Sequence, residues 1–427
     1  MQSKQIDAVW ELTAPSAPTS KRLDEDINTE VLIIGAGFSG LSAALHLQDS
    51  SHDVVLIDAH SIAWGASGRN GGHVLPLIRK DPAAIIEQLG PEQGERLIRM
   101  VAESADLVFS MIERFEIECD AERNGWLQAI HSAQQLTVCE NRLQQWQAYA
   151  ADMALLEQNE TSTLMGTDAY MGALFVGSGG HINPLAFARG MAEAAIKGGT
   201  RIFTDTPALA LEEKGGRWQV KTPKGTITTE KIILATAAYS DALWPDLQKS
   251  FLPFYLYNVA TTPLNAELRS SVLPGRQPVT DTRSDAHVFH YDGAGRLISG
   301  GTFIFPYKWK PRLLTHVNNV LSSTFPQIES PQFELDHIWR GKVSMTADIL
   351  PHMHVLAPNV FTWLGCNARG IGLATRMGAV LADAVNEVPM QDWPIQAIEM
   401  QGIPAHAFSN MMTSVMLAYY RLRDSYL

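Results

Sequence analysis

Residues 35–40, with the sequence GAGFSG, have the glycine spacing of a loop that holds a dinucleotide pyrophosphate. The apolar run Val31–Ile34 before them predicts a buried strand, and leucines and alanines at helical spacing follow them. Unpaired N–H groups at the start of such a helix can bind phosphate. A second apolar run ends at Asp58, whose carboxylate can accept hydrogen bonds from ribose hydroxyls. Together these residues predict a dinucleotide site whose negative charge repels a 2′-phosphate.

A second glycine-rich segment, WGASGRNGGH at residues 64–73, follows shortly after Asp58. A simple nicotinamide-dependent dehydrogenase would continue here into another crossover helix, whereas this chain continues into an extended loop. Arg69 in the loop offers a fork of donors to phosphate or ring oxygens. His73 at its end is either a hydrogen-bonded structural residue or a contact to cofactor or substrate. We expect the loop to bring backbone close to a bound ligand.

The loop resembles that of FAD enzymes of the D-amino-acid oxidase/glycine oxidase superfamily. It is most similar to the γ-glutamylputrescine oxidase-like branch, where the run looks like GWGASGRNGGQ and glutamine stands at the place of His73. A late segment, GCNARGIGLA at residues 365–374, resembles the family pattern GxSGHGxALA, with Arg369 where histidine is usual. The resemblance covers nearly the whole chain, and its specific parts are residues 31–73 and 361–376.

The resemblance implies a bound FAD whose pyrophosphate lies at the first glycine turn and whose flavin lies along the second loop. Ala208 matches a position whose backbone faces adenine, although a plain strand residue is the alternative. Backbone N–H groups after Arg369 would stabilise negative charge at the flavin N1–C2=O edge. The implied cofactor-binding residues are Gly35, Ala36, Gly37, Phe38, Ser39, Gly40, Asp58, Ala59, Ser67, Gly68, Arg69, Asn70, Gly71, Gly72, Ala208, Thr236, Ala237, Arg369, Gly370, Ile371, Gly372 and Leu373.

Cys366 raises the alternative of a covalent flavin bond. Relatives that tether FAD through cysteine do so in a different local motif, so we expect non-covalent FAD and a small buried thiol here.

The implied fold is α/β combined with antiparallel β structure. It comprises a Rossmann-like FAD-binding domain of the glutathione-reductase type and an interleaved substrate domain on a mixed or antiparallel sheet. Alternation and turns at residues 208–236 predict a β-meander, and Asp292-Gly293 predicts a hairpin turn. The expected boundaries are 1–27 for an N-terminal arm, 28–80, 170–248 and 345–400 for the FAD domain, 81–169 and 249–344 for the substrate domain, and 401–427 for a C-terminal helix.

The substrate pocket is expected among the aromatic-rich residues 250–345. Candidate pocket residues are Tyr255, Tyr257, His287, His290 and Phe303, for each of which core packing is the alternative. Arg340 and Lys342 could bind a substrate carboxylate or assist oxygen reduction, and simple surface charge is the other reading of both. His73 joins these candidates from the glycine-rich loop.

Composition sets further limits. The chain has 427 residues, 46% of them hydrophobic, which allows a large core and two domains. The formal net charge of -12 argues against nucleic acid as a partner, because phosphate binding needs clustered lysines and arginines. Three cysteines without metal or CxxC spacing predict a reducing compartment and no metal site. The sequence shows no signal-like N-terminus and no apolar run of ~20 residues, so we expect a cytoplasmic protein without a membrane span.

The resemblance implies an FAD-dependent amine or amino-acid oxidase or dehydrogenase. A C–N bond of a small substrate would lose a hydride to flavin N5, water would hydrolyse the imine, and O2 or another acceptor would take the electrons. A polyamine-like or γ-glutamylputrescine-like amine is favoured, and a D-amino acid or glycine-type substrate is the alternative. The substitutions at His73 and Arg369 also leave a non-catalytic FAD-binding protein open. The catalytic residues and the oligomeric state stay undetermined.

Two other flavoenzyme classes do not fit. A disulfide reductase needs a CxxC pair and a second strand–GxGxxG–helix unit, and an aromatic hydroxylase is expected to carry a late Gly-Asp motif. The sequence contains none of these.

Overall fold

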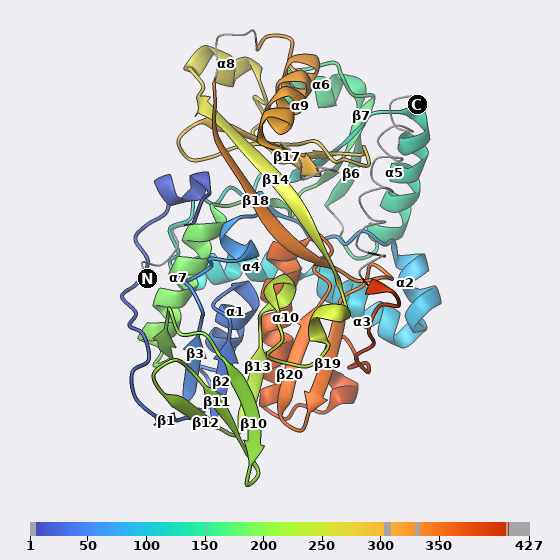
Figure 1. Cartoon of the computed structure of the whole chain (residues 1–427). Helices are drawn as coiled ribbons and strands as arrows, with labels where there is room; N and C mark the ends of the chain where they lie inside the picture. Colours follow the sequence, from blue (N-terminus) through green and yellow to red (C-terminus); the bar gives the residue numbers. More distant parts are fainter. Residues whose placement is uncertain (1–5, 151, 303–308, 329–333, 407–408, 410–427) are drawn as a thin grey trace.

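The computed structural model describes residues 6–150, 152–302, 309–328, 334–406 and 409 (Figure 1). A parallel sheet with helices occupies the lower half of Figure 1, and a long twisted sheet rises above it. Phe303 and most of the predicted C-terminal helix lie outside the described residues.

The lower unit is built on a six-stranded sheet with the order β19-β20-β13-β2-β3-β9. Its strands are β2 (Val31–Ile34), β3 (Val54–Ile57), β9 (Arg201–Phe203), β13 (Lys231–Leu234), β19 (His352–Ala357) and β20 (Val360–Leu364). Neighbouring strands are parallel except β19, which runs antiparallel to β20. Every residue of β2, β3 and β13 is buried, as expected for parallel strands covered on both faces.

Alternate residues of β2 belong to different cores because successive side chains of a strand point to opposite faces. Val31 and Ile33 share a core with the helices α1 (Phe38–His46), α7 (Pro184–Lys197) and α10 (Gly370–Val385). Leu32 and Ile34 share another core with Trp218 of the smaller sheet below. The lower unit therefore has three layers, with the parallel sheet in the middle.

The smaller sheet contains the predicted meander. Its antiparallel strands are β10 (Ala210–Lys214), β11 (Arg217–Lys221) and β12 (Thr226–Thr229), and β1 (Ile27–Asn28) adds to β12 in parallel. The N-terminal arm thus contributes a strand at its end.

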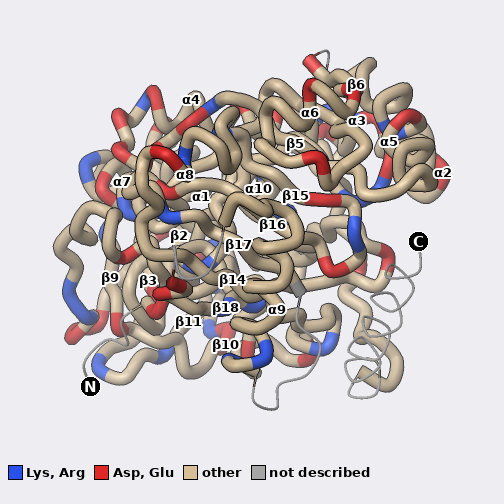
Figure 2. Tube along the Cα trace, turned by 90° about the horizontal axis from the view of Figure 1, so that it is seen from above, with Lys and Arg blue, Asp and Glu red and all other residues tan. Residues whose placement is uncertain are grey.

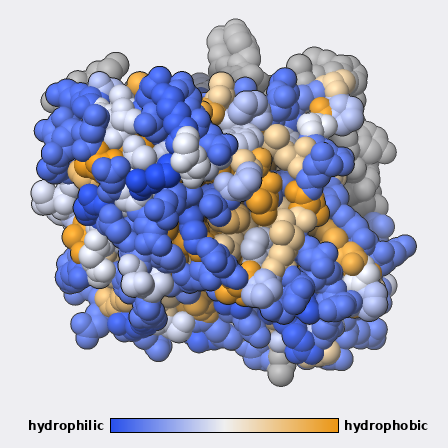
Figure 3. All heavy atoms as spheres, turned by 90° about the horizontal axis from the view of Figure 1, so that it is seen from below, coloured by the Kyte–Doolittle hydropathy of each residue, from blue (hydrophilic) through white to orange (hydrophobic). Residues whose placement is uncertain are grey.

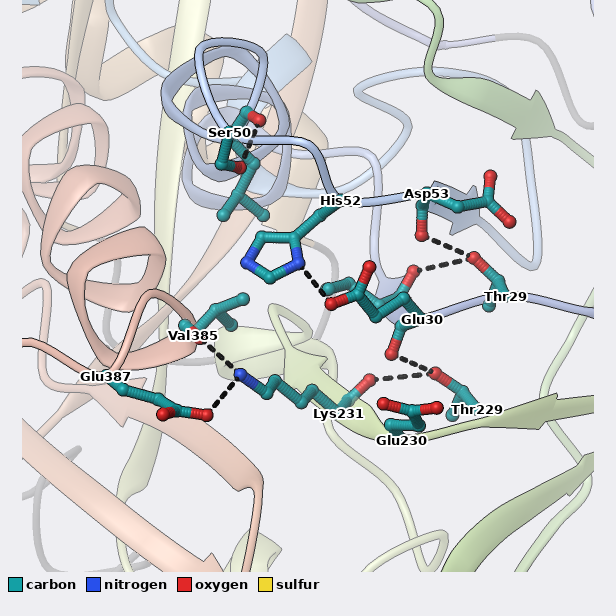
Figure 4. Close-up of polar contacts among 12 residues, drawn as sticks. Thr29, Glu30, Ser50, His52, Asp53, Thr229, Glu230, Lys231, Val385 and Glu387 are labelled. Atoms are coloured by element: carbon teal, nitrogen blue, oxygen red, sulfur yellow. Dashed lines mark hydrogen bonds and ion pairs between the residues drawn. The ribbon is translucent and has the colours of Figure 1, made fainter.

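Polar contacts tie the strand starts together at the end of the sheet away from the glycine turn (Figure 4). The Lys231 ammonium donates to the Val385 carbonyl at 2.7 Å and pairs with Glu387 at 2.8 Å, which links β13 to the end of α10. The Thr29 hydroxyl donates to the Asp53 carbonyl at 2.6 Å and so links β2 to β3. These contacts help to hold β2, β3 and β13 in register, and the glycine turn follows directly after β2.

The upper unit is an eight-stranded sheet with the order β18-β14-β17-β16-β15-β5-β7-β6. Its strands are β5 (Trp126–Ile130), β6 (Met153–Glu157), β7 (Gly172–Val176), β14 (Leu252–Pro263), β15 (Val279–Asp281), β16 (Val288–Tyr291), β17 (Arg296–Thr302) and β18 (Leu335–Met345). All pairs are antiparallel except β5 with β15, and β16 and β17 form the predicted hairpin around Asp292-Gly293. β7 belongs to this sheet although we expected residues from 170 onward in the FAD domain.

Helices complete both units. The remaining helices are α2 (Pro82–Leu89), α3 (Pro91–Ala102), α4 (Ser104–Arg114), α5 (Ala133–Trp146), α6 (Gln158–Met165), α8 (Ala266–Ser271) and α9 (Trp309–Thr324). α3 and α4 pack against α10, whereas α9 contributes to the core of the eight-stranded sheet. A two-stranded ribbon of β4 (His73–Val74) and β8 (Gly180–His181) lies where the second glycine-rich loop ends.

The surface carries both signs of charge. Figure 2 shows acidic and basic residues intermixed along the trace, and Figure 3 shows a mainly polar lower face with a strip of hydrophobic residues near its middle. Within the described residues, no helix is both long and apolar enough to cross a membrane.

Candidate active site

The first glycine turn connects β2 to α1, and two of its glycines are required by close approach. Gly35 has φ +118°, and a Cβ there would lie 2.6 Å from the Ala235 carbonyl oxygen. A Cβ on Gly40 would lie 2.0 Å from the Gly35 carbonyl oxygen. The turn therefore keeps α1 in contact with β2 and directs the first N–H groups of α1 outward.

Asp58 lies at the end of β3, directly beside this turn. Its carboxylate accepts hydrogen bonds from the backbone N–H groups of Ala36 and His60, both at 2.8 Å. Burial raises the pKa of the Asp58 carboxyl and outweighs the two hydrogen bonds, which lower it, so the pKa is about 6. The carboxylate is thus held next to the pyrophosphate loop, as the fingerprint requires.

The loop of residues 64–73 is firmly held and is not a loose connector. Its Arg69 carbonyl accepts hydrogen bonds from the Trp339 indole at 3.0 Å and the Asn258 amide at 3.3 Å. The Asn70 carbonyl accepts another from the Trp10 indole at 2.9 Å. Three segments far apart in the sequence therefore fix the backbone of this loop.

Two side chains of the loop face the glycine turn or the cavity. The Ser67 hydroxyl accepts a hydrogen bond from the Phe38 N–H at 3.0 Å, at the first turn of α1. The Arg69 guanidinium lies 4.5 Å from the Trp64 ring centre, and burial lowers its pKa.

A cavity of about 400 Å³ lies between the two glycine-rich segments, the strands β14, β15 and β18, and the start of α10. Of the predicted cofactor residues, those that line it are Gly37, Phe38, Ser39, Ser67, Arg69, Asn70, Gly71, Ala237, Arg369, Gly370 and Ile371. Those that do not are Gly35, Ala36, Gly40, Asp58, Ala59, Gly68, Gly72, Ala208, Thr236, Gly372 and Leu373. The structure thus brings the second loop and the start of α10 to one cavity, with the Asp58 end outside it.

The substrate candidates divide in the same way. His73 and Tyr257 line the cavity, and His290 lies behind His73 with a nitrogen 3.2 Å away. Tyr255 and His287 do not line it, and the His287 imidazole lies 3.3 Å from the Asp281 carboxylate.

Arg340 and Lys342 do not line the cavity, because Gly341 and Val343 do, and alternate residues of β18 face opposite sides. The exposed Arg340 guanidinium lies 4.9 Å from the Tyr255 ring centre.

Three other arginines converge on the cavity. Arg79, Arg142 and Arg369 all line it, and Arg142 pairs with Asp81 at 2.7 Å. Arg79 donates to the Asn367 carbonyl, and the Arg369 guanidinium has no carboxylate partner among the described residues. Burial and the charges of the other two arginines lower the pKa of Arg369 to about 9. This wall of the cavity therefore carries more positive charge than its own acids neutralise.

Sequence reasoning missed Arg79 and Arg142. Arg142 lies in α5, and no motif around it distinguishes it from a surface arginine.

Comparison with known proteins agrees with this architecture. The sequence profile of the DAO family, described as FAD dependent oxidoreductase, matches residues 30–384. The chain belongs to this family. Its sequence is 29% identical over 414 residues to the gamma-glutamylputrescine oxidoreductase of Escherichia coli, covering 94% of both chains. It is 27% identical over 408 residues to the probable oxidoreductase OrdL of Haemophilus influenzae, covering 93% of both. The solved L-proline dehydrogenase from P. horikoshii has a similar fold, with a TM-score of 0.73 at 18% identity, covering 87% of this chain and 96% of that one.

As a member of the DAO family, the chain is an FAD-dependent oxidoreductase, and its residues fit that cofactor. The N-termini of α1 and α10 both lie at the cavity, so each offers unpaired N–H donors to phosphate or carbonyl oxygens. A Cβ on Gly37 would lie 3.0 Å from the Ser67 hydroxyl oxygen, and one on Gly370 would meet only Cys366, at 3.9 Å. Cys366, also at the cavity, is 9% exposed and lies 3.8 Å from the Ser344 carbonyl oxygen.

Proposed function

We propose that this chain oxidises a C–N bond of a small amine that also carries a carboxylate, with a γ-glutamylputrescine-like amine favoured. The observation that carries the proposal is the group of Arg79, Arg142 and Arg369 at the cavity, where only Arg142 has a carboxylate partner among the described residues. Buried cations are normally paired, and arginine binds carboxylates through two parallel hydrogen bonds. A carboxylate on the substrate would complete this wall.

The residues that line the cavity would position the substrate and exclude water. The three arginines would hold its carboxylate at one wall, while Leu256, Tyr257 and Val343 present apolar surface to its chain. FAD, when bound, supplies the acceptor for the hydride that leaves the substrate carbon. Holding the amine carbon in line with that acceptor is the main task of such a pocket.

The position of the carboxylate separates the two candidate substrate classes. In a D-amino acid or glycine-type substrate, the carboxylate is attached to the carbon that loses the hydride. In a γ-glutamylated amine, it lies at the far end of a chain several bonds long. The similarity to the gamma-glutamylputrescine oxidoreductase supports the second class.

The test is an anaerobic visible spectrum of the FAD-loaded protein with γ-glutamylputrescine, putrescine, glycine and D-alanine. Loss of the oxidised flavin band with γ-glutamylputrescine is the expected result. Loss with glycine or D-alanine alone would move the assignment to the amino-acid class. A band that no amine bleaches would favour an FAD-binding protein without turnover.

A variant tests the arginine wall directly. We expect Arg369→Met to raise the KM for γ-glutamylputrescine about tenfold to a hundredfold, because a charge-assisted hydrogen bond is lost. The matched control is the carboxamide analogue of the same substrate, which has the same length without the negative charge. Its KM should change little in the variant, and an equal increase for both compounds would contradict the assignment.

A further inference from the structure

Three histidines form a buried cluster between the cavity and the outside. His73 and His181 are paired residues of the ribbon β4–β8, and His290 comes from β16. His181 is 4% exposed and His290 is 0% exposed, and the Trp10 ring stacks on His290 with ring centres 5.8 Å apart. The proposed substrate binding leaves His181 and His290 without a role.

Short distances connect the cluster to the cavity. The Thr280 hydroxyl, which lines the cavity, lies 3.3 Å from His73 Nδ1. His73 Nε2 lies 3.2 Å from His290 Nδ1. The rings of His290 and His181 have centres 5.5 Å apart, and His181 Nε2 lies 3.9 Å from Glu122.

Trp126 is compatible with hydrogen bonds that run outward from the cavity. Its indole N–H can only donate, and it donates to the Thr280 hydroxyl oxygen at 3.4 Å. The hydroxyl keeps one proton and a second lone pair, so it can donate to His73 Nδ1, which is the direction that a path out of the cavity requires. A neutral His73 consequently carries its proton on Nε2 and donates it to His290 Nδ1. By the same rule His290 carries its proton on Nε2.

The next link is between His290 and His181, whose rings share no direct hydrogen bond within the described part of the chain. His290 Nε2 and His181 Nδ1 are buried and have no hydrogen-bond partner among the described residues. A neutral His181 with its proton on Nε2, facing Glu122, leaves Nδ1 free to accept. Next to His181, a small cavity of about 10 Å³ is lined by Asp120 and Glu122, about the space of one water. With these tautomers the Nε2–H groups run in one direction from His73 to His181. A bridging water is needed to connect His290 with His181, and another to connect His181 with Glu122, which is 3.9 Å away.

Burial lowers the pKa of all three histidines, which favours neutral rings. Burial, with His181 and Arg369 nearby, lowers the pKa of His73 to about 3, and burial lowers that of His181 to about 4. The charged groups that face the outer end are Glu122, which pairs with Arg276, and Asp120, whose pKa burial and Asp292 raise. A neutral imidazole can accept a proton on one nitrogen while it releases another.

We propose that Thr280, His73, His290 and His181 form a proton path from the cavity to Glu122, which is half-exposed at the outer end. The proposal rests on the proposed amine oxidation. When an alkylammonium group is oxidised to a protonated imine, the C–H bond and one N–H bond break and a C=N double bond forms. The carbon loses a hydride, which goes to FAD, and the nitrogen loses a separate proton. The path moves that proton from the substrate nitrogen through the four side chains to Glu122 and then to solvent, with water completing the links from His290 to His181 and from His181 to Glu122.

One experiment measures anaerobic flavin reduction by the substrate from pH 7 to 10. In His181→Gln we expect a rate at least tenfold lower at pH 7, within the usual range of acid–base effects. The difference should shrink as the pH nears about 10, the pKa of an alkyl amine, because a free amine brings no such proton. The matched control is His354→Gln, a buried histidine of β19 that does not line the cavity, and it should follow the parent protein.

Glu122→Gln provides a second variant at a half-exposed position, so misfolding of His181→Gln does not decide the matter. It should reproduce the pH-dependent defect with an unchanged FAD absorbance spectrum. A defect of equal size at every pH in both variants, or no defect in either, would overturn the proton path.

A readout without substrate keeps this test separate from the proposed function. In the FAD-loaded protein with 15N-labelled histidines, the side chains of His73, His181 and His290 should show protonated Nε2 and accepting Nδ1 from pH 5 to 9, assigned by single His→Gln variants. A charged ring or a protonated Nδ1 in this range would refute the path. If no amine reduces the flavin while these tautomers are found, the proposed function fails and the arrangement of the path stands.

Discussion

The cofactor end and the substrate end of the site are built in opposite ways. The first is made of consecutive residues, and its chemistry lies in backbone N–H groups that the glycine turn and Asp58 position. The second is made of side chains brought together from α5, the segment before α2, and the start of α10. A local motif therefore specifies the cofactor end, whereas the substrate end is assembled only when the chain folds.

The physical constraint also differs between the two ends. At the cofactor end the constraint is steric, since one added carbon would meet backbone atoms. At the substrate end it is electrostatic, since positive charges lie together in a buried wall. A steric conflict lowers the stability of the folded protein with or without a ligand. An unpaired buried charge is instead neutralised when a ligand of opposite charge binds.

The largest effect is expected from Gly40→Ala. Helix propensity alone would favour alanine within α1 by about 1 kcal/mol. The close approach predicts the opposite, because the new Cβ would lie 2.0 Å from the Gly35 carbonyl oxygen and α1 would have to move. We expect at least a hundredfold loss of FAD affinity together with a lower Tm.

FAD per chain, measured by absorbance, and thermal unfolding check this result. Gly199→Ala is the control, because its φ of +97° is unfavourable for alanine while no atom lies within 4 Å of the new Cβ. Gly199→Ala should lower the free energy of unfolding by about 1–2 kcal/mol and leave FAD binding unchanged. Full FAD binding by Gly40→Ala would show that the steric account of this end is wrong.

A smaller effect is expected from pH through Asp58. Its pKa of about 6 is above the ordinary value of 3.8, so in the FAD-free protein this group contributes stability below pH 4 that is lost as the pH rises through 6. FAD needs the ionised carboxylate as an acceptor for its ribose hydroxyls. FAD affinity should therefore fall by up to about tenfold per pH unit below 6, while the Tm of the FAD-free protein rises over the same range.

Asp58→Asn removes the titrating group but keeps an acceptor oxygen. In this variant both pH dependences should be flatter, as measured by fluorescence titration with FAD and by thermal unfolding at pH 5 and 7. If the parent protein binds FAD equally well at both pH values, Asp58 does not carry the ribose contact.

The contrast between a local motif and residues distant in sequence also decides which parts of the site the sequence could predict. The strand, glycine turn and helix of residues 31–46 are local, so hydrophobic periodicity and glycine spacing were sufficient to predict them. Arg142 joins the cavity only because α5 packs beside β5, and a single sequence carries no signal for that approach. For Arg340 the sequence left carboxylate binding, oxygen reduction and simple surface charge open, because it does not show which residues of β18 face the cavity.

The smallest effect is therefore expected from Arg340→Ala. The side chain is exposed and stacks near Tyr255 at 4.9 Å and Trp309 at 5.6 Å, and cation–π contacts at exposed sites are worth about 0.5–1 kcal/mol. We expect a KM for a carboxylate substrate within twofold of the parent value, and a small decrease in Tm. Steady-state kinetics of Arg340→Ala and Arg369→Met, measured in the same assay, compare the effects of the two arginines on the KM.

The result bears on the assembly of the whole substrate end. If Arg340→Ala leaves the carboxylate substrate unaffected while Arg369→Met does not, the anion is bound by the wall that α5 and α10 build. If Arg340→Ala raises the KM tenfold for that substrate and not for its carboxamide analogue, the anion lies instead toward β18. The carboxylate would then be held by a strand, and the positive charge around Arg369 would need another ligand to balance it.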